Sequence, residues 1–141
     1  MATLVDTGAL FALAHENDHY HQPIKTYFST HRDTWIVPAP VVTETCIGIL
    51  DRLGANAEIA FLRSLAAKEM LVEDVAHADL KRAIEILEQY RDAEFGMVDA
   101  TTMAIAERLK IEVIATLDRR DFTIYRPKHC AAFRLVPDLT K

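Results

Sequence analysis

The sequence predicts an α/β domain with a central, mainly parallel sheet of about five strands covered by helices. Short apolar segments alternate along the chain with longer segments whose apolar residues recur at helical spacing, and this alternation is typical of parallel sheets with right-handed crossovers. The segment 113–115 has no alternating polar side, as expected of a central strand covered on both faces. The chain has 141 residues, half of them hydrophobic, and shows no repeat or linker, so we expect one domain over 1–141.

The first elements are expected to be a strand that leads directly into a helix. Residues 3–5 (Thr-Leu-Val) form a short apolar strand that ends at Asp6. Residues 8–14 then predict a helix, because Asp6 or Thr7 supplies the kind of oxygen-bearing side chain that caps a helix N-terminus.

A second helix and a second strand follow. Residues 18–30 predict a helix entered through Pro23, since proline is tolerated in a first turn, where its missing N–H has no intrahelical partner. Residues 35–37 (Trp-Ile-Val) predict a strand that Pro38 ends, because proline cannot donate to a strand ladder.

The third helix is expected to follow Pro40 and to end near Gly54, a residue favoured just past a helix C-terminus. Asn56 then predicts the cap of a fourth helix, and residues 70–72 (Met-Leu-Val) predict a strand. Apolar residues recur at helical spacing in the third helix: Val42, Cys46, Ile49, Leu50 and Leu53.

The remaining elements continue the alternation. Residues 80–90 predict an amphipathic helix, and residues 97–109 predict a helix so apolar that we expect burial on more than one side. Residues 113–115 are the expected central strand, and 133–136 a final edge strand. In the amphipathic helix the apolar face is Leu80, Ala83, Ile84, Leu87 and Tyr90, and the polar face is Lys81, Arg82, Glu85 and Glu88.

Composition excludes several classes of protein. The net charge of −5 argues against nucleic-acid binding through a broad basic surface. The two cysteines have no C-x-x-C spacing, so neither a disulfide framework nor a zinc finger is expected. Because no basic leader precedes an apolar run and no stretch reaches about 20 apolar residues, we expect a cytoplasmic protein without a membrane span. The most basic segment is Arg119, Arg120, Arg126, Lys128 and Arg134.

Four acidic residues fall where a parallel sheet gathers ligands. Asp6 ends the first strand, and Asp118 lies just past the strand 113–115; ligands in open parallel sheets collect outside the carboxyl ends of the strands. Glu44 and Asp99 lie near the beginnings of helices, from which they can project toward the same edge. Each acid taken singly also suits a helix N-terminus or a turn.

Taken together, the acids predict a site for a hard divalent cation. Asp6 and Asp99 stand in apolar surroundings, and neither they nor Glu44 have a Lys or Arg neighbour in sequence. Carboxylates that share a crevice raise one another's pKa values unless cations neutralise them. Ligation by oxygen alone, with no His or Cys, favours Mg²⁺ or Mn²⁺ over zinc. Magnesium keeps coordination positions for water and substrate phosphate, which is typical of phosphodiester cleavage.

At these residues the sequence resembles the PIN-domain family, and within it the VapC-like toxins. The resemblance spans nearly the whole chain, with four acids in the family's order and in the expected strand or helix context. It is carried by residues 5–10 (Val-Asp-Thr-Gly-Ala-Leu), 42–44 (Val-Thr-Glu), 98–100 (Val-Asp-Ala) and 115–122 (Ala-Thr-Leu-Asp-Arg-Arg-Asp-Phe).

The resemblance implies an α/β/α sandwich, a metal-dependent ribonuclease, a homodimer and inhibition by a small antitoxin. Carried over by position, Asp6 and Asp99 are the main metal ligands, Asp118 assists them and Glu44 completes the acidic pocket. Further expected roles are a fifth acid for Asp121, orientation of ligands or water by Thr7 and Thr116, and RNA contact, or else a solvated surface, for Arg119 and Arg120.

These residues predict RNA hydrolysis by water activated at bound Mg²⁺, with 5′-phosphate products. One alternative is a PIN-type nuclease of ordinary RNA processing, with the same chemistry. Another is a PIN-shaped binding module without activity, against which the retention of all four acids weighs. An aspartate-based phosphatase or phosphotransferase is disfavoured, because Gly8 stands where such enzymes usually carry a second acid.

Overall fold

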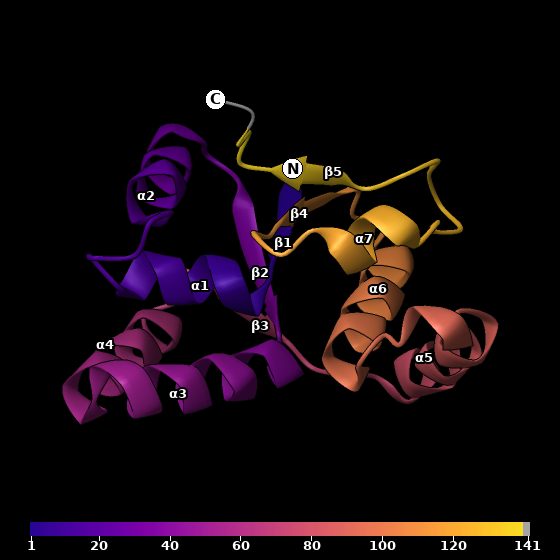
Figure 1. Ribbon diagram of the computed structural model, residues 1–141, viewed down its shortest axis with the longest axis horizontal. Coiled ribbons are helices and arrows are strands. Elements are labelled where there is room, and N and C mark those ends of the chain that lie inside the picture. The colour runs from indigo at the N-terminus through magenta and orange to yellow at the C-terminus, as the bar shows by residue number, and fades with distance from the viewer. Residues whose placement is uncertain (140–141) are drawn as a thin grey trace.

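A five-stranded, wholly parallel sheet lies between two layers of helices in the computed structural model, which describes residues 1–139 (Figure 1). The predicted α/β/α architecture is therefore confirmed. The last two residues of the predicted domain, 140 and 141, lie outside the described part of the chain. The strands are β1 (Ala2–Val5), β2 (Thr34–Pro38), β3 (Leu71–Glu73), β4 (Val113–Ala115) and β5 (Arg134–Val136). The helices are α1 (Thr7–Ala14), α2 (His21–Thr30), α3 (Ala39–Leu53), α4 (Ala55–Ala66), α5 (His77–Gln89), α6 (Met97–Leu109) and α7 (Arg120–Ile124), with a 3-10 turn at Arg91–Ala93.

Successive strand residues point into two different cores. Leu4 packs with the layer of α5, α6 and α7, whereas the next residue, Val5, packs with the layer of α1 to α4. In β4 the middle residue, Ile114, joins the first layer and its two neighbours join the second. This alternation follows from the two-residue period of a strand. It explains why β4 is apolar throughout: all three of its residues are buried.

The sheet order is β3-β2-β1-β4-β5, so the strand order reverses between β1 and β4. The chain moves outward from β1 through β2 to β3, then crosses with α5 and α6 to the other side of β1. A crevice at such a reversal, outside the carboxyl ends of the strands, is where ligands bind in open α/β sheets. Asp6 follows β1 and Asp118 lies beyond β4, which places both acids at this point.

Several boundaries differ from the predictions. Helix α2 begins at His21, not at 18, because residues 15–21 form turns in which the amide of Tyr20 donates to Asp18 Oδ1 at 2.8 Å. Helix α4 is entered through Gly54, with φ of +93°, and not through Asn56. Strand β3 begins one residue later than predicted, and the short helix α7 was not predicted.

The buried face of α5 was predicted only in part, since Ala83, Leu87 and Tyr90 pack against the core as expected. Leu80 and Ile84, expected on the core side, are 43% and 56% exposed, whereas Asp79 is 2% exposed. Arg82, expected on the solvent side, is half-buried. The helix is rotated from its apolar face because Asp79 and Arg82 form ion pairs with α6. Helix α6 was predicted to the residue, and its positions 100–106 are all buried. No helix within residues 1–139 is both long and apolar enough to cross a bilayer.

Candidate metal centre

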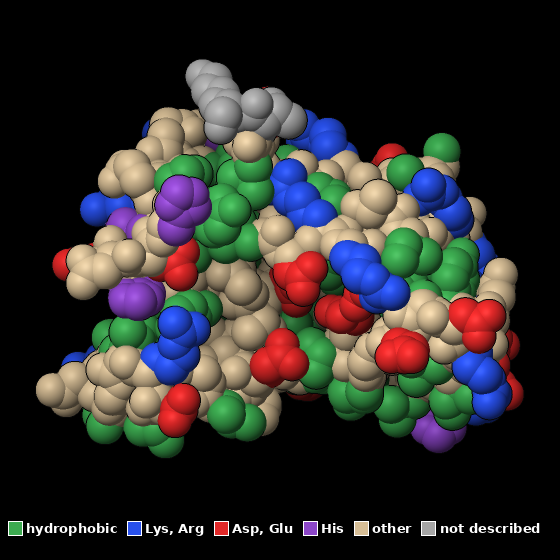
Figure 2. All heavy atoms as spheres, in the orientation of Figure 1, with side chains coloured by type: hydrophobic (Ala, Val, Ile, Leu, Met, Phe, Trp, Pro, Cys, Tyr) green, Lys and Arg blue, Asp and Glu red, His purple; other side chains and the backbone are tan. Residues whose placement is uncertain are grey.

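Five carboxylates gather at the carboxyl edge of the sheet, where Figure 2 shows acidic side chains together at the centre of the visible face. Their mutual electrostatic influence shows the proximity: Glu44 and Asp118 act on Asp6, while Asp6, Glu44 and Asp121 act on Asp99. The structure thus brings together all four acids of the predicted set, and Asp121 with them.

Asp6 is held rigidly at the end of β1. Its backbone amide donates to the carbonyl of Ala115 at 2.9 Å, which ties it to the end of β4, and its side chain is buried. Burial raises the pKa of Asp6 to about 6; the amide of Thr7 and the hydroxyl of Thr116 oppose this rise, and the charges of Glu44 and Asp118 add to it. A cation bound beside this carboxyl group would lower its pKa and favour release of its proton to solvent.

Asp99 lies in the first turn of α6. Burial is the largest cause that raises its pKa to about 8, followed by the adjacent carboxyl group of Asp121 and by the negative charges of Asp6 and Glu44. Carboxylates held close together repel one another, which disfavours the charged form. The pair therefore stores repulsion that a divalent cation would relieve.

Two threonines stand beside these acids. Thr116 is fully buried, and its hydroxyl lies 3.1 Å from Asp6 Oδ2 and 3.1 Å from the carbonyl oxygen of Asp118, so it can donate to either. The Oγ1 of Thr7 is buried and, among residues 1–139, has no hydrogen-bond partner. An orphaned oxygen next to Asp6 is an open position for a water or an ion, because buried polar groups are normally satisfied.

One of the neighbouring arginines pairs with Asp121, but they leave the four predicted acids without an ion pair in the described part of the chain. Arg119 donates from Nε to the carbonyl of Thr116 at 3.0 Å and from its other end to the carbonyl of Pro137, so its side chain joins the ends of β4 and β5. Arg120 pairs with Asp121 at 2.6 Å and also donates to the carbonyl of Ala93. In the described part of the chain, no ion pair involves Asp6, Glu44, Asp99 or Asp118.

The donor set matches a hard divalent cation. The side chains that converge offer carboxylate and hydroxyl oxygens, without nitrogen or sulfur, and they carry excess negative charge. Within residues 1–139, no three acidic, histidine or cysteine side chains form a group that could hold an ion as it stands. Magnesium does not require such a group, since it usually binds one or two protein carboxylates and completes its shell with water and phosphate.

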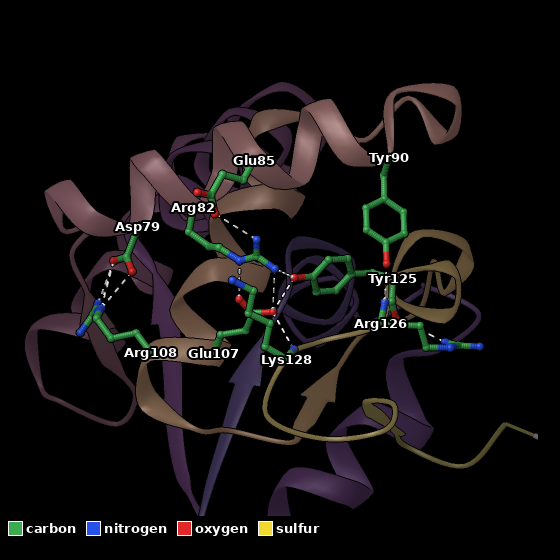
Figure 3. Close-up of polar contacts among 9 residues, drawn as sticks. All are labelled: Asp79, Arg82, Glu85, Tyr90, Glu107, Arg108, Tyr125, Arg126 and Lys128. Carbon is green, nitrogen blue, oxygen red and sulfur yellow. Dashed lines mark hydrogen bonds and ion pairs between the residues drawn. The ribbon is translucent and has the colours of Figure 1, made fainter.

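Residues outside the predicted set fix the elements that carry the acids. Glu107, in the last turn of α6, accepts from Arg82 Nε at 2.7 Å, from the Tyr125 hydroxyl at 2.5 Å and from the amide of Lys128 at 2.9 Å (Figure 3). Tyr125 follows α7 directly, so this network joins the helix of Asp99 to that of Asp121. The sequence did not predict this network, because Arg82, Glu107 and the segment 125–128 are far apart in the chain. The signal that could have indicated it is a charged residue, Arg82, next to the apolar residues Ala83 and Ile84.

An open groove of about 840 Å³ adjoins the cluster on the side of Glu44. Its other walls come from the beginnings of α3 and α6 and from the end of β3, and they are mainly apolar. Ile47 and Met97 on these walls are 66% and 52% exposed. The sequence did not predict this groove, since it depends on how α3 lies against α6.

Comparison with known proteins identifies relatives of this chain. The sequence pattern of the PIN domain matches residues 3–126. Ribonuclease VapC26 of Mycobacterium tuberculosis is 31% identical over 134 residues, which cover 95% of this chain and 99% of that protein.

Two solved structures share the fold. The Mycobacterium tuberculosis VapC20, described as a sarcin-ricin loop cleaving toxin, superposes with a TM-score of 0.78 at 24% identity and covers 84% of this chain and 91% of that one. FitAcB from Neisseria gonorrhoeae superposes with a TM-score of 0.65 at 15% identity, and the match covers 86% of this chain and 91% of that one.

Proposed function

The chain belongs to the PIN-domain family, and we propose that it is a Mg²⁺-dependent endoribonuclease, the toxin of a VapBC-type toxin–antitoxin pair. The observation that carries this proposal is the set of unpaired carboxylates around Asp6 and Asp99 at the strand-order reversal. The ribonuclease relative, which matches nearly the whole chain, supports it. Mn²⁺ is an alternative ion, because it also prefers oxygen ligands.

In this proposal Asp6 and Asp99 are the main metal ligands, with Asp118 and Glu44 completing the site. When these residues hold Mg²⁺, the ion would supply activation of water for attack on the scissile phosphate and stabilisation of the leaving oxygen. Thr116 orients the Asp6 carboxylate through its hydroxyl, 3.1 Å away. Because the pKa of Asp99 is raised to about 8, metal binding at this carboxylate would release a proton, since ligand carboxylates must be deprotonated.

We expect RNA to be contacted by a few basic residues near the site, because a net charge of −5 argues against binding through a broad basic surface. Arg119 is half-buried and donates to two backbone carbonyls, whereas Arg120 remains 57% exposed although it also contacts Asp121 and the carbonyl of Ala93. We therefore propose Arg120 as the better candidate for RNA contact and assign Arg119 to holding the loop of Asp118.

Partners are proposed on the same basis. A cognate antitoxin follows from the likeness to VapC proteins. A homodimer is supported by exposed apolar side chains on neighbouring helices, with Ile47 66% and Leu50 50% exposed on α3, because such patches commonly mark interfaces. We further propose that residues 1–141 act as one cytoplasmic domain.

The test is to sequence RNA ends after induced expression of the wild type beside Asp6→Asn. The wild type should produce new 5′-phosphate ends and arrest growth, and both effects should vanish in the variant. Growth arrest relieved by a small protein encoded next to this gene would separate the toxin from an RNA-processing nuclease. Full cleavage by purified Asp6→Asn, or products with cyclic phosphate ends, would contradict the proposal.

A further inference from the structure

A second surface, formed by α1 and α3, continues from the acids. We propose that Phe11, His15, Gly48 and Arg52 form a base platform, a subsite that stacks one nucleobase of single-stranded RNA and holds its phosphate. The inference rests on the proposed function, because it assigns a part of the RNA substrate to a place beside the metal centre. None of these residues belongs to the acidic cluster.

The platform residues lie on the same two helices, α1 and α3, that begin near the acids. Glu44, Gly48 and Arg52 are spaced four residues apart on α3, so they lie on one side of that helix. Phe11 lies one turn into α1, which begins directly after Asp6. The two helices pack side by side (Figure 1). Eight residues of helix place Arg52 about 12 Å from Glu44 along the axis.

The aromatic ring of Phe11 is held in a fixed orientation. The Arg52 guanidinium lies 4.7 Å from the ring centroid, and His15 meets the ring edge to face at 5.6 Å with an interplanar angle of 77°. On the α3 side the ring lies next to Gly48, where an added Cβ would be 3.7 Å from the ring. Phe11 nonetheless remains partly exposed, so this is a preorganised aromatic surface and not a core residue.

The charge of Arg52 is available to a ligand. Arg82, Arg108 and Arg120 each pair with carboxylates. Arg52 is exposed and, within residues 1–139, takes part in no ion pair. Figure 2 shows a basic side chain over α1 and α3, on the other side of the central hollow from the acidic group. A cation near a metal site in an acidic protein attracts the phosphates of a bound strand.

The chemistry of the platform favours a nucleobase over a peptide. Unpaired bases stack on aromatic rings and on guanidinium planes, and this interaction tolerates any base. A docking helix would need an apolar stripe at helical spacing. Here His15 and Arg52 interrupt the apolar surface around Phe11. One aromatic ring can stack one base and one cation can contact its phosphate, so the platform has the size for a single nucleotide.

The test measures RNA affinity apart from cleavage. A short fluorescein-labelled oligoadenylate is titrated by fluorescence anisotropy with Asp6→Asn protein, so that the RNA stays intact. Phe11→Leu and Arg52→Gln, each added to this protein, should weaken binding about fivefold or more, since stacking contributes about 1–3 kcal/mol per base. Phe11→Tyr should bind like the parent, because it keeps the ring.

Matched controls separate stacking from general charge. Arg63 is, like Arg52, an exposed arginine in the last turn of its helix, and Arg63→Gln should change the affinity less than about twofold. On an oligonucleotide with abasic sugars, Phe11→Leu should lose its effect. Equal binding of oligoadenylate by Phe11→Leu and the parent, with both folded by circular dichroism, would overturn the platform. An equal loss of affinity in Phe11→Leu for oligoadenylate and for the abasic oligonucleotide would also overturn it, because the loss would then not depend on a base.

Failure of the platform and failure of the proposed function give different results. If the wild type with Mg²⁺ cuts RNA while Phe11→Leu and Arg52→Gln bind as tightly as the parent, the nuclease stands and the platform is rejected. If the wild type cuts no RNA but its binding depends on Phe11 and on the bases, the platform stands and the nuclease is rejected. A protein partner whose binding alone depends on Phe11 would also reject the platform.

Discussion

Buried acids occur in two regions of this molecule and are treated in opposite ways. In the network of α5, α6 and the segment after α7, Asp79 pairs with Arg108 at 3.0 Å and Glu107 pairs with Arg82 at 2.7 Å (Figure 3). At the carboxyl edge of the sheet, Asp6 and Asp99 have no cationic partner in the described part of the chain.

The pKa values show the difference. The pKa of Glu107 is lowered: hydrogen bonds from Arg82, Tyr125 and Lys128 outweigh burial, which is the largest single cause and acts in the opposite direction. The pKa values of Asp6 and Asp99 are raised to about 6 and about 8, by burial first and by neighbouring acids. The fold thus pairs the acids that hold helices together with cations and leaves Asp6 and Asp99 without a cationic partner in the described part of the chain.

The largest effect is expected from breaking the paired region. Arg82→Ala would leave Glu107 without its cation in a site where its side chain is 9% exposed. Removing one partner of a buried ion pair costs about 3–5 kcal/mol, so the free energy of unfolding, measured with urea, should fall by about that amount. Arg63→Ala, on an exposed helix site, is the control and should change it by less than about 0.5 kcal/mol. A loss below about 1 kcal/mol in Arg82→Ala would show that the pairing is not structural.

In the unpaired region, removal of a charge should raise the free energy of unfolding and not lower it. Without divalent metal at pH 9, Asp99→Asn should stabilise the fold by about 1 kcal/mol, after allowance for the solvent screening of a partly exposed group. The reason is that the substitution removes a charge that the other acids repel. The measurement is urea unfolding in chelator, with Asp51→Asn on the exposed side of α3 as the control. Destabilisation by Asp99→Asn at pH 9 would mean that this acid has a partner.

The same acids should make the metal-free protein less stable as pH rises. Because the folded pKa values of Asp6 and Asp99 lie above their ordinary 3.8, the folded state holds more protons than the unfolded state between about pH 4 and pH 8. Their contribution is therefore present at low pH and is lost as pH passes 6 and then 8. Glu107 has the reverse dependence, since its lowered pKa gives stability above pH 4.5 that is lost in acid. Thermal unfolding between pH 5 and 8.5 should show a decline that Asp99→Asn reduces; an unchanged decline would contradict this origin.

A further prediction concerns one hydroxyl group in the network. Tyr125→Phe removes the 2.5 Å hydrogen bond to Glu107 and should cost about 1.5–3 kcal/mol, as expected for a bond to a charged group. Tyr90→Phe removes a 3.2 Å bond from the amide of Arg126 and should cost less, because that bond is longer and neutral. Urea unfolding of the two variants side by side decides; a greater loss in Tyr90→Phe would contradict the ranking.

Local sequence patterns predicted most of the fold. The apolar run of β4 and the periodicity of α6 gave boundaries that the structure confirms. These two elements are buried on more than one side, so their apolar residues continue over nearly the whole element and mark where it begins and ends. The start of α2 was missed, since the Asp18 turn competes with a helical turn. The face of α5 was missed because the partners of Arg82 and Asp79 lie about 25 or more residues away.

The acidic cluster was predictable in membership but not in its chemistry. Strand ends placed Asp6 and Asp118, and helix beginnings placed Glu44 and Asp99, so their proximity followed from a parallel sheet. The proximity of Asp121 to Asp99 depends on the unpredicted helix α7. The engagement of Arg119 with Pro137 depends on how β5 ends. Such contacts arise only from the tertiary fold.

The central claim is that the unpaired acids form a site for a hard divalent cation. The most direct test is the melting temperature as MgCl₂ or MnCl₂ is added at pH 8, for the wild type, Asp6→Asn and Asp99→Asn. Binding to the folded state alone stabilises it, so the wild type should melt several degrees higher with metal and each variant should lose most of that shift. A wild-type melting temperature that is independent of both ions, or equal shifts in all three proteins, would contradict the account.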